Sequence, residues 1–208
     1  MAISPKEALS IIFKAAESYQ KNLIDQSLLF LCLDKHKKTY CIEVTFDASN
    51  FKHLTGVQTK LSALHFYEMC LDHRLSTNDF SFAEDGTTIW KMEVLPRLIS
   101  KNLSANMIGE YNGSMPILFT ERIAGGTSAC MGFVRSDENG RYIPNTILKG
   151  DVRTLVYKAD RIIATYRKKR LESQYKEIVY AAKKVDWEKI VLPCDFQYLP
   201  LPEQKTRE

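Results

Sequence analysis

Apolar residues recur at helical spacing over roughly the first twenty positions, which predicts a helix from about residue 5 to 22. Ser4 precedes this stretch and is a favoured N-cap residue. Pro5 suits the first helical turn, and Glu7 lies three positions after the serine, where it completes a capping box. The pattern and the cap predict the same starting point for the helix.

Two strand patterns follow this helix. Residues 28–33 are continuously apolar, and residues 40–46 alternate between apolar and polar positions. The polar residues 34–38 lie between them and are typical of a turn. We therefore predict a β-hairpin.

The stretch NFKHLTGVQTK, residues 50–60, also alternates, after a turn-rich break. This alternation predicts a short third strand that carries His53, Thr55 and Gly56 on its polar face. Helical spacing then returns over residues 60–75 and again from about residue 88, where Pro96 either kinks the helix or ends it.

The second half of the chain is rich in strand patterns. Asn112-Gly113 is a strong hairpin signal, and Pro144 marks an edge or an irregular strand. The last two patterns also fit helices, because Ala, Lys and Glu are common in them. The predicted strands cover residues 107–111, 115–122, 127–135, 141–148, 161–168 and 175–182.

These elements predict one α+β domain over residues 1–192, in which N-terminal helices and a hairpin pack on a C-terminal antiparallel sheet. Residues 193–208 contain three prolines and no periodic pattern, so we expect an extended or disordered tail. No repeat or linker divides the chain.

Composition favours a soluble cytoplasmic protein. The longest apolar run is too short to cross a bilayer, and the N-terminus lacks the features of a signal peptide. The five cysteines have no metal-binding spacing, so neither a disulfide framework nor a metal site is expected.

The net charge of +4 is unevenly distributed along the chain. Residues 149–189 contain twelve Lys or Arg and six Asp or Glu, a local charge of +6, and the remainder of the chain sums to −2. Such a basic segment attracts RNA or DNA, or it forms an ordinary solvated face.

Sequence motifs exclude several common chemistries. The chain has no phosphate-binding glycine loop, dinucleotide fingerprint, zinc-protease helix or nucleophile elbow. RNA cleavage remains open, because the 2′-hydroxyl of RNA attacks the neighbouring phosphate without a metal or cofactor when a protein supplies acid, base and cationic groups. The residues available for this chemistry are His53, Lys149, Arg153, Tyr157, Arg161 and Lys168.

Three segments carry a family resemblance: FDASNFKHLTGV, RYIPNTILKGDVR and YKEIVYAAKKVDWEKI. Together they resemble a phage- and mobile-element-associated family that is grouped with the barnase, EndoU, colicin and RelE nucleases. The resemblance extends from about residue 5 to 190, and F-x-H-L-T-G is its most distinctive motif. It implies a toxin-like, RNA-binding hydrolase that needs no cofactor and has an immunity or host protein as a second partner.

The resemblance implies a catalytic set of His53, Thr55, Lys149 and Arg153. Each residue also has an ordinary structural explanation, such as a hydrogen-bonded strand histidine or a solvated loop cation. The chain lacks the late-strand glutamate and following histidine of barnase-like chemistry, which favours a Lys/Arg mechanism or no catalysis. The substrate-binding set that we expect is Gly56, Tyr157, Arg161 and Lys168.

Two alternatives remain open. A strand that ends in H-x-T also resembles an ADP-ribosyltransferase, in which a strand histidine holds NAD; Glu121 and Glu177 are then the candidates for the later glutamate. The other alternative is a non-catalytic module that binds nucleic acid or protein. A cleft location for His53 would favour an enzyme, and a buried ring would favour a structural role.

Overall fold

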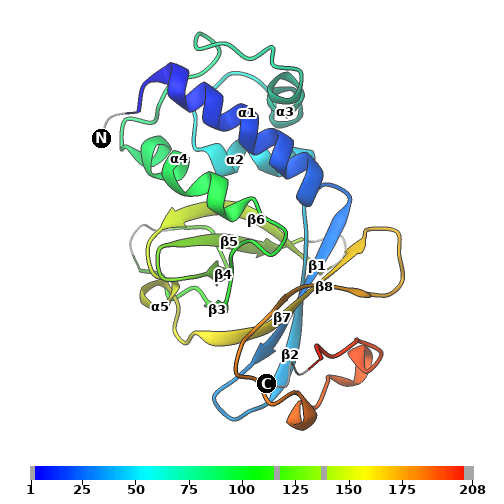
Figure 1. Cartoon of the computed structure of the whole chain (residues 1–208). Helices are drawn as coiled ribbons and strands as arrows, with labels where there is room; N and C mark the ends of the chain where they lie inside the picture. Colours follow the sequence, from blue (N-terminus) through cyan, green and yellow to red (C-terminus); the bar gives the residue numbers. More distant parts are fainter. Residues whose placement is uncertain (1–2, 115–117, 137–139, 204–208) are drawn as a thin grey trace, which may run out of the picture.

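The computed structural model describes residues 3–114, 118–136 and 140–203. Four helices gather at one end of the molecule, and a curled sheet fills the rest (Figure 1). The predicted α+β class, with helices and a hairpin first and an antiparallel sheet later, is confirmed. The helices are α1 (Pro5–Asn22), α2 (Phe51–Thr55), α3 (Ala63–Leu71), α4 (Thr87–Leu98) and α5 (Val152–Leu155).

The described residues form an eight-stranded sheet in the order β1-β2-β6-β5-β4-β3-β7-β8. Strand β7 also pairs with β1, so the first seven strands in this order close into a ring and β8 lies outside it. The pairings are antiparallel except for one parallel bridge between Val44 and Tyr142. The strands are β1 (Gln26–Leu33), β2 (Thr39–Thr45), β3 (Met107–Glu110), β4 (Arg122–Gly125), β5 (Ala129–Arg135), β6 (Tyr142–Lys149), β7 (Asp160–Lys169) and β8 (Glu177–Ala181).

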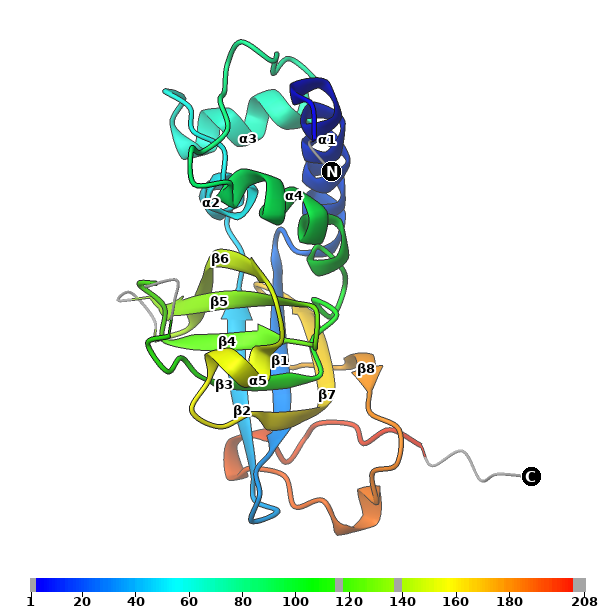
Figure 2. The same ribbon diagram turned by 90° about the vertical axis from the view of Figure 1, so that its left-hand side faces the viewer.

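The closed ring gives the sheet an inner and an outer face. Alternate residues of β1 point to opposite faces and pack in two different cores. Leu28 and Phe30 join a main core that includes Ile12 of α1. Leu29 and Leu31 face the other way and join a smaller core. Because side chains alternate along a strand, a strand buried on both faces reads as the continuous apolar run seen in the sequence. Figure 2 shows α1, α2, α3 and α4 above one end of the ring.

Helix α1 confirms the predicted first helix. The Ser4 hydroxyl accepts a hydrogen bond from the backbone N–H of Glu7 at 3.3 Å, and the Ser4 N–H donates to the Glu7 carboxylate at 2.8 Å. These two bonds form the capping box. None of the described helices is long and apolar enough to cross a bilayer.

The third strand predicted over residues 50–60 is wrong, because residues 51–55 form α2. Phe51 and Leu54 are three positions apart and both are fully buried, which one helical turn permits. Gly56 then adopts a left-handed conformation with φ of +70°, the usual way to end a helix. The alternating pattern fitted a strand only because a single helical turn is too short to establish its own period.

Most of the other predicted elements are confirmed within a few residues. The pattern over residues 161–182, for which helices were an open alternative, forms β7 and β8. Pro144 lies where the pairing of β5 with β6 shifts register, as expected for an irregular strand. The predicted helix over residues 60–75 is shorter, because Ser62 caps it and α3 begins at residue 63.

The strand predicted over residues 115–122 is partly wrong. Residues 115–117 lie outside the described residues, and β4 begins only at Arg122. The Asn145 side chain explains this late start, because it donates to the Phe119 carbonyl and accepts from the Thr120 hydroxyl at 2.7 Å. These side-chain bonds replace ladder bonds in this part of the connection.

Part of the segment expected to be a tail packs against the outer face of the sheet. Leu199 is buried in the smaller core, and the Tyr166 hydroxyl donates to the Pro200 carbonyl at 3.0 Å. A short 3-10 turn covers residues 194–196. Residues 204–208 lie outside the described residues.

Candidate active site

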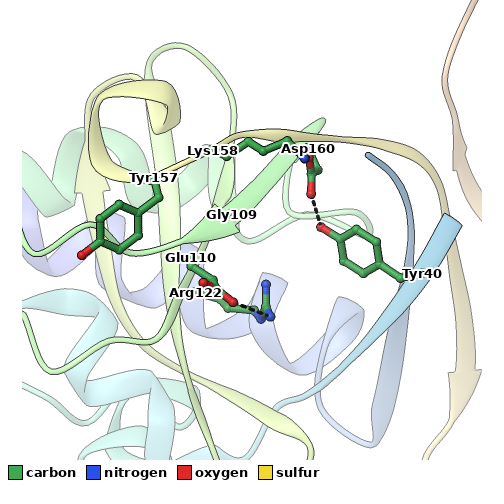
Figure 3. A pocket seen from close by; sticks show the side chains of 7 residues that line it. All are labelled: Tyr40, Gly109, Glu110, Arg122, Tyr157, Lys158 and Asp160. Atoms are coloured by element: carbon green, nitrogen blue, oxygen red, sulfur yellow. Dashed lines mark hydrogen bonds and ion pairs between the residues drawn. The ribbon is translucent and has the colours of Figure 1, made fainter. Parts of the chain in front are cut away.

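Two adjoining cavities open on the ring, and they share Tyr40 and Arg122. The first has a volume of about 270 Å³ and lies between the start of β2, the end of β3 and the start of β7. The second has a volume of about 430 Å³ and extends along β2 towards the β5–β6 turn. The two cavities therefore form one depression, with Arg122 and Tyr40 at their junction. Figure 3 shows both residues among those that line the first cavity.

Strand geometry directs Arg122 and Tyr142 towards each other. Arg122 is two residues from Ala124 on β4, and Tyr142 is at the start of β6; Ala124 and Tyr142 both belong to the main core. Residues two apart on a strand share a face, so Arg122 also points inwards. Its Nε–H donates to the Tyr142 hydroxyl at 3.0 Å.

Arg135 reaches the same phenol from the neighbouring strand. It is the direct cross-strand partner of Tyr142 in the β5–β6 pair. One of its terminal nitrogens donates to the Tyr142 hydroxyl at 3.4 Å, and its guanidinium carbon lies 5.4 Å from the centre of the ring. The Arg122 guanidinium lies 5.7 Å from that centre. Two cations therefore flank one tyrosine, which is an unusual concentration of positive charge on a sheet.

Glu110 completes the group around Arg122. It is the cross-strand partner of Arg122 in the β3–β4 pair, and its carboxylate accepts from the guanidinium at 3.3 Å. The Glu110 side chain is 68% exposed, whereas that of Arg122 is 22% exposed. Burial opposes the charge of Arg122, but the Tyr142 hydroxyl and the Glu110 carboxylate together outweigh it and raise the pKa of the guanidinium.

A second polar group lines the other side of the first cavity. The Tyr40 hydroxyl donates to Asp160 at 2.9 Å, and the Lys158 ammonium lies 2.8 Å from the other oxygen of this carboxylate. Burial raises the pKa of Tyr40, and the nearby Cys32 thiol and Asp160 carboxylate raise it further, so the phenol stays protonated at neutral pH. Figure 3 shows Tyr157 and Tyr40 on opposite sides of the Glu110–Arg122 pair.

The second cavity ends at Glu43 and Arg141. The Glu43 carboxylate lies 3.2 Å from the Arg141 side chain, and it also accepts from the Tyr175 hydroxyl. Burial and then Glu43 raise the pKa of Tyr175. Together the two cavities are lined by four cations and three carboxylates: Arg122, Arg135, Arg141 and Lys158, with Glu43, Glu110 and Asp160.

This arrangement can bind an anionic group at Arg122. Arg122 carries five N–H donors, and its described contacts use two of them, so donors remain for an anionic oxygen. An exposed carboxylate and a phenol lie on either side of the same guanidinium. Among the described residues, no three His, Cys, Asp or Glu side chains lie close enough together to hold a metal ion.

The structure places His53, Thr55 and Gly56 in the helical layer. The His53 side chain is exposed on α2, and the Lys91 ammonium donates to its backbone carbonyl at 2.8 Å. The Thr55 hydroxyl is buried and donates to the Lys52 carbonyl at 2.7 Å. The Gly56 carbonyl accepts from Thr88 of α4 at 2.6 Å. The bonds at His53 and Gly56 join the α2 segment to α4, and none of the three residues lines either cavity.

Lys149 and Arg153 form separate ion pairs at the surface. Lys149 ends β6 and pairs with Glu93 of α4. The Arg153 guanidinium donates to Asp151, which caps the short helix α5, at 3.0 Å. These ion pairs do not involve His53, so within the described residues the structure does not gather the predicted catalytic set around one point.

The predicted substrate-binding residues are also distributed over the molecule. Tyr157 does line the first cavity, with 77% of its surface exposed. Arg161 donates to the Lys183 carbonyl on the outer face. Lys168 is buried, with its ammonium 4.7 Å from the Tyr175 ring and 3.8 Å from Glu43. Lys168 therefore lies next to Glu43, which lines the second cavity, but it does not line that cavity itself.

The residues that suggested an ADP-ribosyltransferase also lie in surroundings other than those predicted. His53 lies on a helix and does not end a strand. Glu177 forms an ion pair with Arg167, and Glu121 accepts from the backbone of Arg135. The predicted strand histidine on which this alternative rests is therefore absent.

Arg122, Arg135 and Tyr142 were missed because their grouping depends on strand register. One signal was available in the sequence. Two strands predicted at 127–135 and 141–148 with a turn between them place Arg135 opposite Tyr142. The third member, Arg122, could not be placed, because the strand that holds it was predicted to begin seven residues too early.

Comparison of the chain with curated proteins and with solved structures finds no match. One family model does match, over residues 11–184, and its description is phage-Barnase-EndoU-ColicinE5/D-RelE like nuclease4. The match covers most of the chain, including all the strands that line the two cavities. The chain therefore belongs to this family of nuclease-like proteins.

Proposed function

We propose that the protein cleaves RNA at the Arg122 depression, using the 2′-hydroxyl of the substrate as the nucleophile. The observation that carries the proposal is the position of the Arg122 guanidinium between an exposed carboxylate, Glu110, and a phenol, Tyr142. Membership of a nuclease-like family supports a phosphodiester as the substrate. A phosphate that bound Arg122 would have a base candidate on one side and an acid candidate on the other.

In the proposed step, the Glu110 carboxylate takes the proton of the 2′-hydroxyl, and the 2′-oxygen attacks the adjacent phosphorus. The bond from phosphorus to the 5′-oxygen breaks, and Tyr142 donates its proton to that leaving oxygen. The products are a 2′,3′-cyclic phosphate and a 5′-hydroxyl. Because the Tyr142 oxygen accepts from Arg122 and Arg135, its own hydrogen is free to point towards the substrate.

Arg122 and Arg135 would stabilise the additional negative charge of the transition state. Donors that are already held in place before the reaction are the most effective, since they need no reorganisation as the charge develops. Arg122 fits this description, with a side chain that is only 22% exposed and fixed by two partners. Tyr40 stays protonated, so its role is to hold Asp160, and through it Lys158, at the rim.

The family also supports a toxin-like role. Phage or mobile-element origin, cytoplasmic RNA as the target, and an immunity or host protein as a second partner belong to the same proposal. The proposed reaction uses no cofactor. It differs from the set implied by the sequence in the location of the chemistry, which lies on the sheet instead of at His53.

The test is cleavage of total RNA by the purified protein in EDTA, with end-group analysis of the products. Arg122→Ala is expected to lower the rate about 100- to 1,000-fold, as for the loss of one preorganised donor. Arg167→Ala is the matched control, because Arg167 also pairs with a glutamate directly across the strands, but at β7–β8. It should retain the wild-type rate, with both variants folded by circular dichroism.

His53→Ala tests the competing location on α2. If cleavage were lost in this variant and kept in Arg122→Ala, the chemistry would belong to the helical layer and the proposal would be wrong. A parallel assay with labelled NAD and a cell lysate covers the remaining enzyme class. Label transfer without RNA cleavage would support an ADP-ribosyltransferase instead.

A further inference from the structure

Unpaired lysines gather at the tip of the β1–β2 hairpin and on the segment that follows β8. We call this set the hairpin-tip surface. All five side chains are exposed, and no ion pair is found for them within the described residues. The hairpin-tip surface consists of Lys35, Lys37, Lys38, Lys183 and Lys184.

Hydrogen bonds from side chains to backbone carbonyls bring the two segments together. Leu33, the last residue of β1, is the cross-strand partner of Arg161 on β7, and the Arg161 guanidinium donates to the Lys183 carbonyl. On the other side of the tip, the Thr39 hydroxyl donates to the Val191 carbonyl. Figures 1 and 2 both show the hairpin tip beside the C-terminal segment, at the end of the molecule away from the helices.

The surface also adjoins the first cavity, because Tyr40 near the start of β2 lines that cavity and follows Lys38 by two positions. Lys158 lines that cavity and lies near enough to the hairpin turn to help lower the pKa of Asp34, after the larger effect of the Lys38 backbone N–H. Asp34 itself is occupied within the turn, where it accepts from the backbone of His36 at 2.7 Å and of Lys38 at 2.8 Å. The turn therefore presents its lysines without a carboxylate that bridges them.

We infer that the hairpin-tip surface binds the phosphodiester backbone of a single RNA strand on one side of the cleaved bond. The strand would pass from Arg122 over Lys158 to the β1–β2 turn. This inference rests on the proposed nuclease function, and it adds a binding site outside the reacting group. Extended ammonium groups on flexible stems suit a phosphate chain, since each neutralises one phosphate and releases counterions.

The test is binding of a single-stranded 2′-O-methyl RNA of about 16 nucleotides, a length that spans a typical single-strand site. This probe lacks the 2′-nucleophile, so its binding is independent of cleavage. Anisotropy is measured at several salt concentrations for the wild type and for a variant with all five lysines of the hairpin-tip surface changed to Gln. The control variant makes the same charge change in the helical layer, at Lys6, Lys14, Lys21, Lys60 and Lys101.

If two or three of the five lysines contact phosphates, the slope of log K against log salt concentration becomes shallower in the five-lysine variant by about 1.4 to 2. The affinity of this variant at 0.1 M salt is then roughly 25- to 100-fold lower than that of the wild type. The control variant should bind as the wild type does. Equal losses in both variants, or no loss in either, would overturn the inference. Equally tight binding of polyglutamate of the same charge would assign the surface to an acidic protein instead. Failure of the nuclease function would be separate, since it would be seen as intact RNA in the cleavage assay.

Discussion

The Tyr142→Phe variant separates chemistry from structure, because it removes one oxygen and keeps the ring. The lost hydroxyl accepts from Arg122 at 3.0 Å and from Arg135 at 3.4 Å. The contacts of both guanidinium groups with the ring, at 5.7 and 5.4 Å, do not need the hydroxyl. Bonds to charged donors contribute about 1.5–3 kcal/mol when buried. Arg135 is exposed, so we expect a loss of only about 1 kcal/mol of unfolding free energy.

The expected loss of activity is much larger. Removal of a general acid costs roughly 100- to 10,000-fold in rate, or about 2.7–5.5 kcal/mol of activation free energy. The assay compares two substrates. One is a dinucleotide, whose 5′-oxygen needs a proton to leave; the other is a nucleoside 3′-(4-nitrophenyl phosphate), whose leaving group departs as a stable anion. We expect kcat to fall for the first substrate and to remain within a few-fold of wild type for the second.

Tyr166→Phe is the control for loss of a tyrosine hydroxyl. Its hydroxyl donates to the Pro200 carbonyl at 3.0 Å on the outer face, away from both cavities. This variant should lose some stability and no activity on either substrate. If Tyr142→Phe lowered kcat equally for both substrates, Tyr142 would be a positioning residue for the arginines. A kcat within threefold of wild type on the dinucleotide would refute the acid role altogether.

Three further predictions concern the helical layer and the C-terminal segment. Gly56→Ala should lower the unfolding free energy more than Gly86→Ala does. Both glycines have positive φ, a conformation that costs alanine about 1–2 kcal/mol. Only at Gly56 would the new Cβ also crowd a neighbour, because it would lie 2.7 Å from the Lys91 side chain. Urea titration of both variants measures the difference, and equal costs would contradict it. Burial lowers the pKa of Lys91 from 10.5 to about 8, so between these pH values the folded state binds fewer protons than the unfolded state. The wild type should therefore gain stability relative to Lys91→Met as the pH rises from about 8 to 10.5, by at most about 1.4 kcal/mol per pH unit. A stability difference that does not change with pH would show that the ammonium is solvated. Leu199→Ala should lower the unfolding free energy by about 2–5 kcal/mol, because this side chain is buried in the smaller core, whereas an unchanged midpoint would mean that the segment adds nothing to the fold.

Most of the fold was predictable because its signals are local. The capping box, the hairpin and five of the six later strands depend on neighbours within a few positions, and they lie within a few residues of where the pattern placed them. Helix α2 was not predictable in the same way, since Phe51 and Leu54 fit either one helical turn or two faces of a strand. Tertiary packing decides this case: both residues reach the main core together only if the segment is helical.

The closure of the sheet had no local signal. Pairing of β1 with β7 joins residues that are more than 120 positions apart, and it converts an open sheet into a ring. The sequence contains the apolar run that makes β1 fit between two neighbours, but it does not state which strand the second neighbour is. Without the ring there is no inner face, and without an inner face the charged residues at the strand ends appear to be ordinary solvated positions.

The same reasoning explains why the most distinctive motif of the sequence lies apart from the candidate site. In F-x-H-L-T-G, the phenylalanine and leucine are core residues, the threonine bonds within its own turn, and the glycine carbonyl bonds to Thr88. Each letter except the histidine has a structural reason to be there. The group around Arg122, in contrast, takes one residue from each of four strands, β3, β4, β5 and β6, so it leaves no contiguous motif. A search for short motifs therefore finds the joint between α2 and α4, whereas the pairs Glu110–Arg122 and Arg135–Tyr142 emerge only from the register of the sheet.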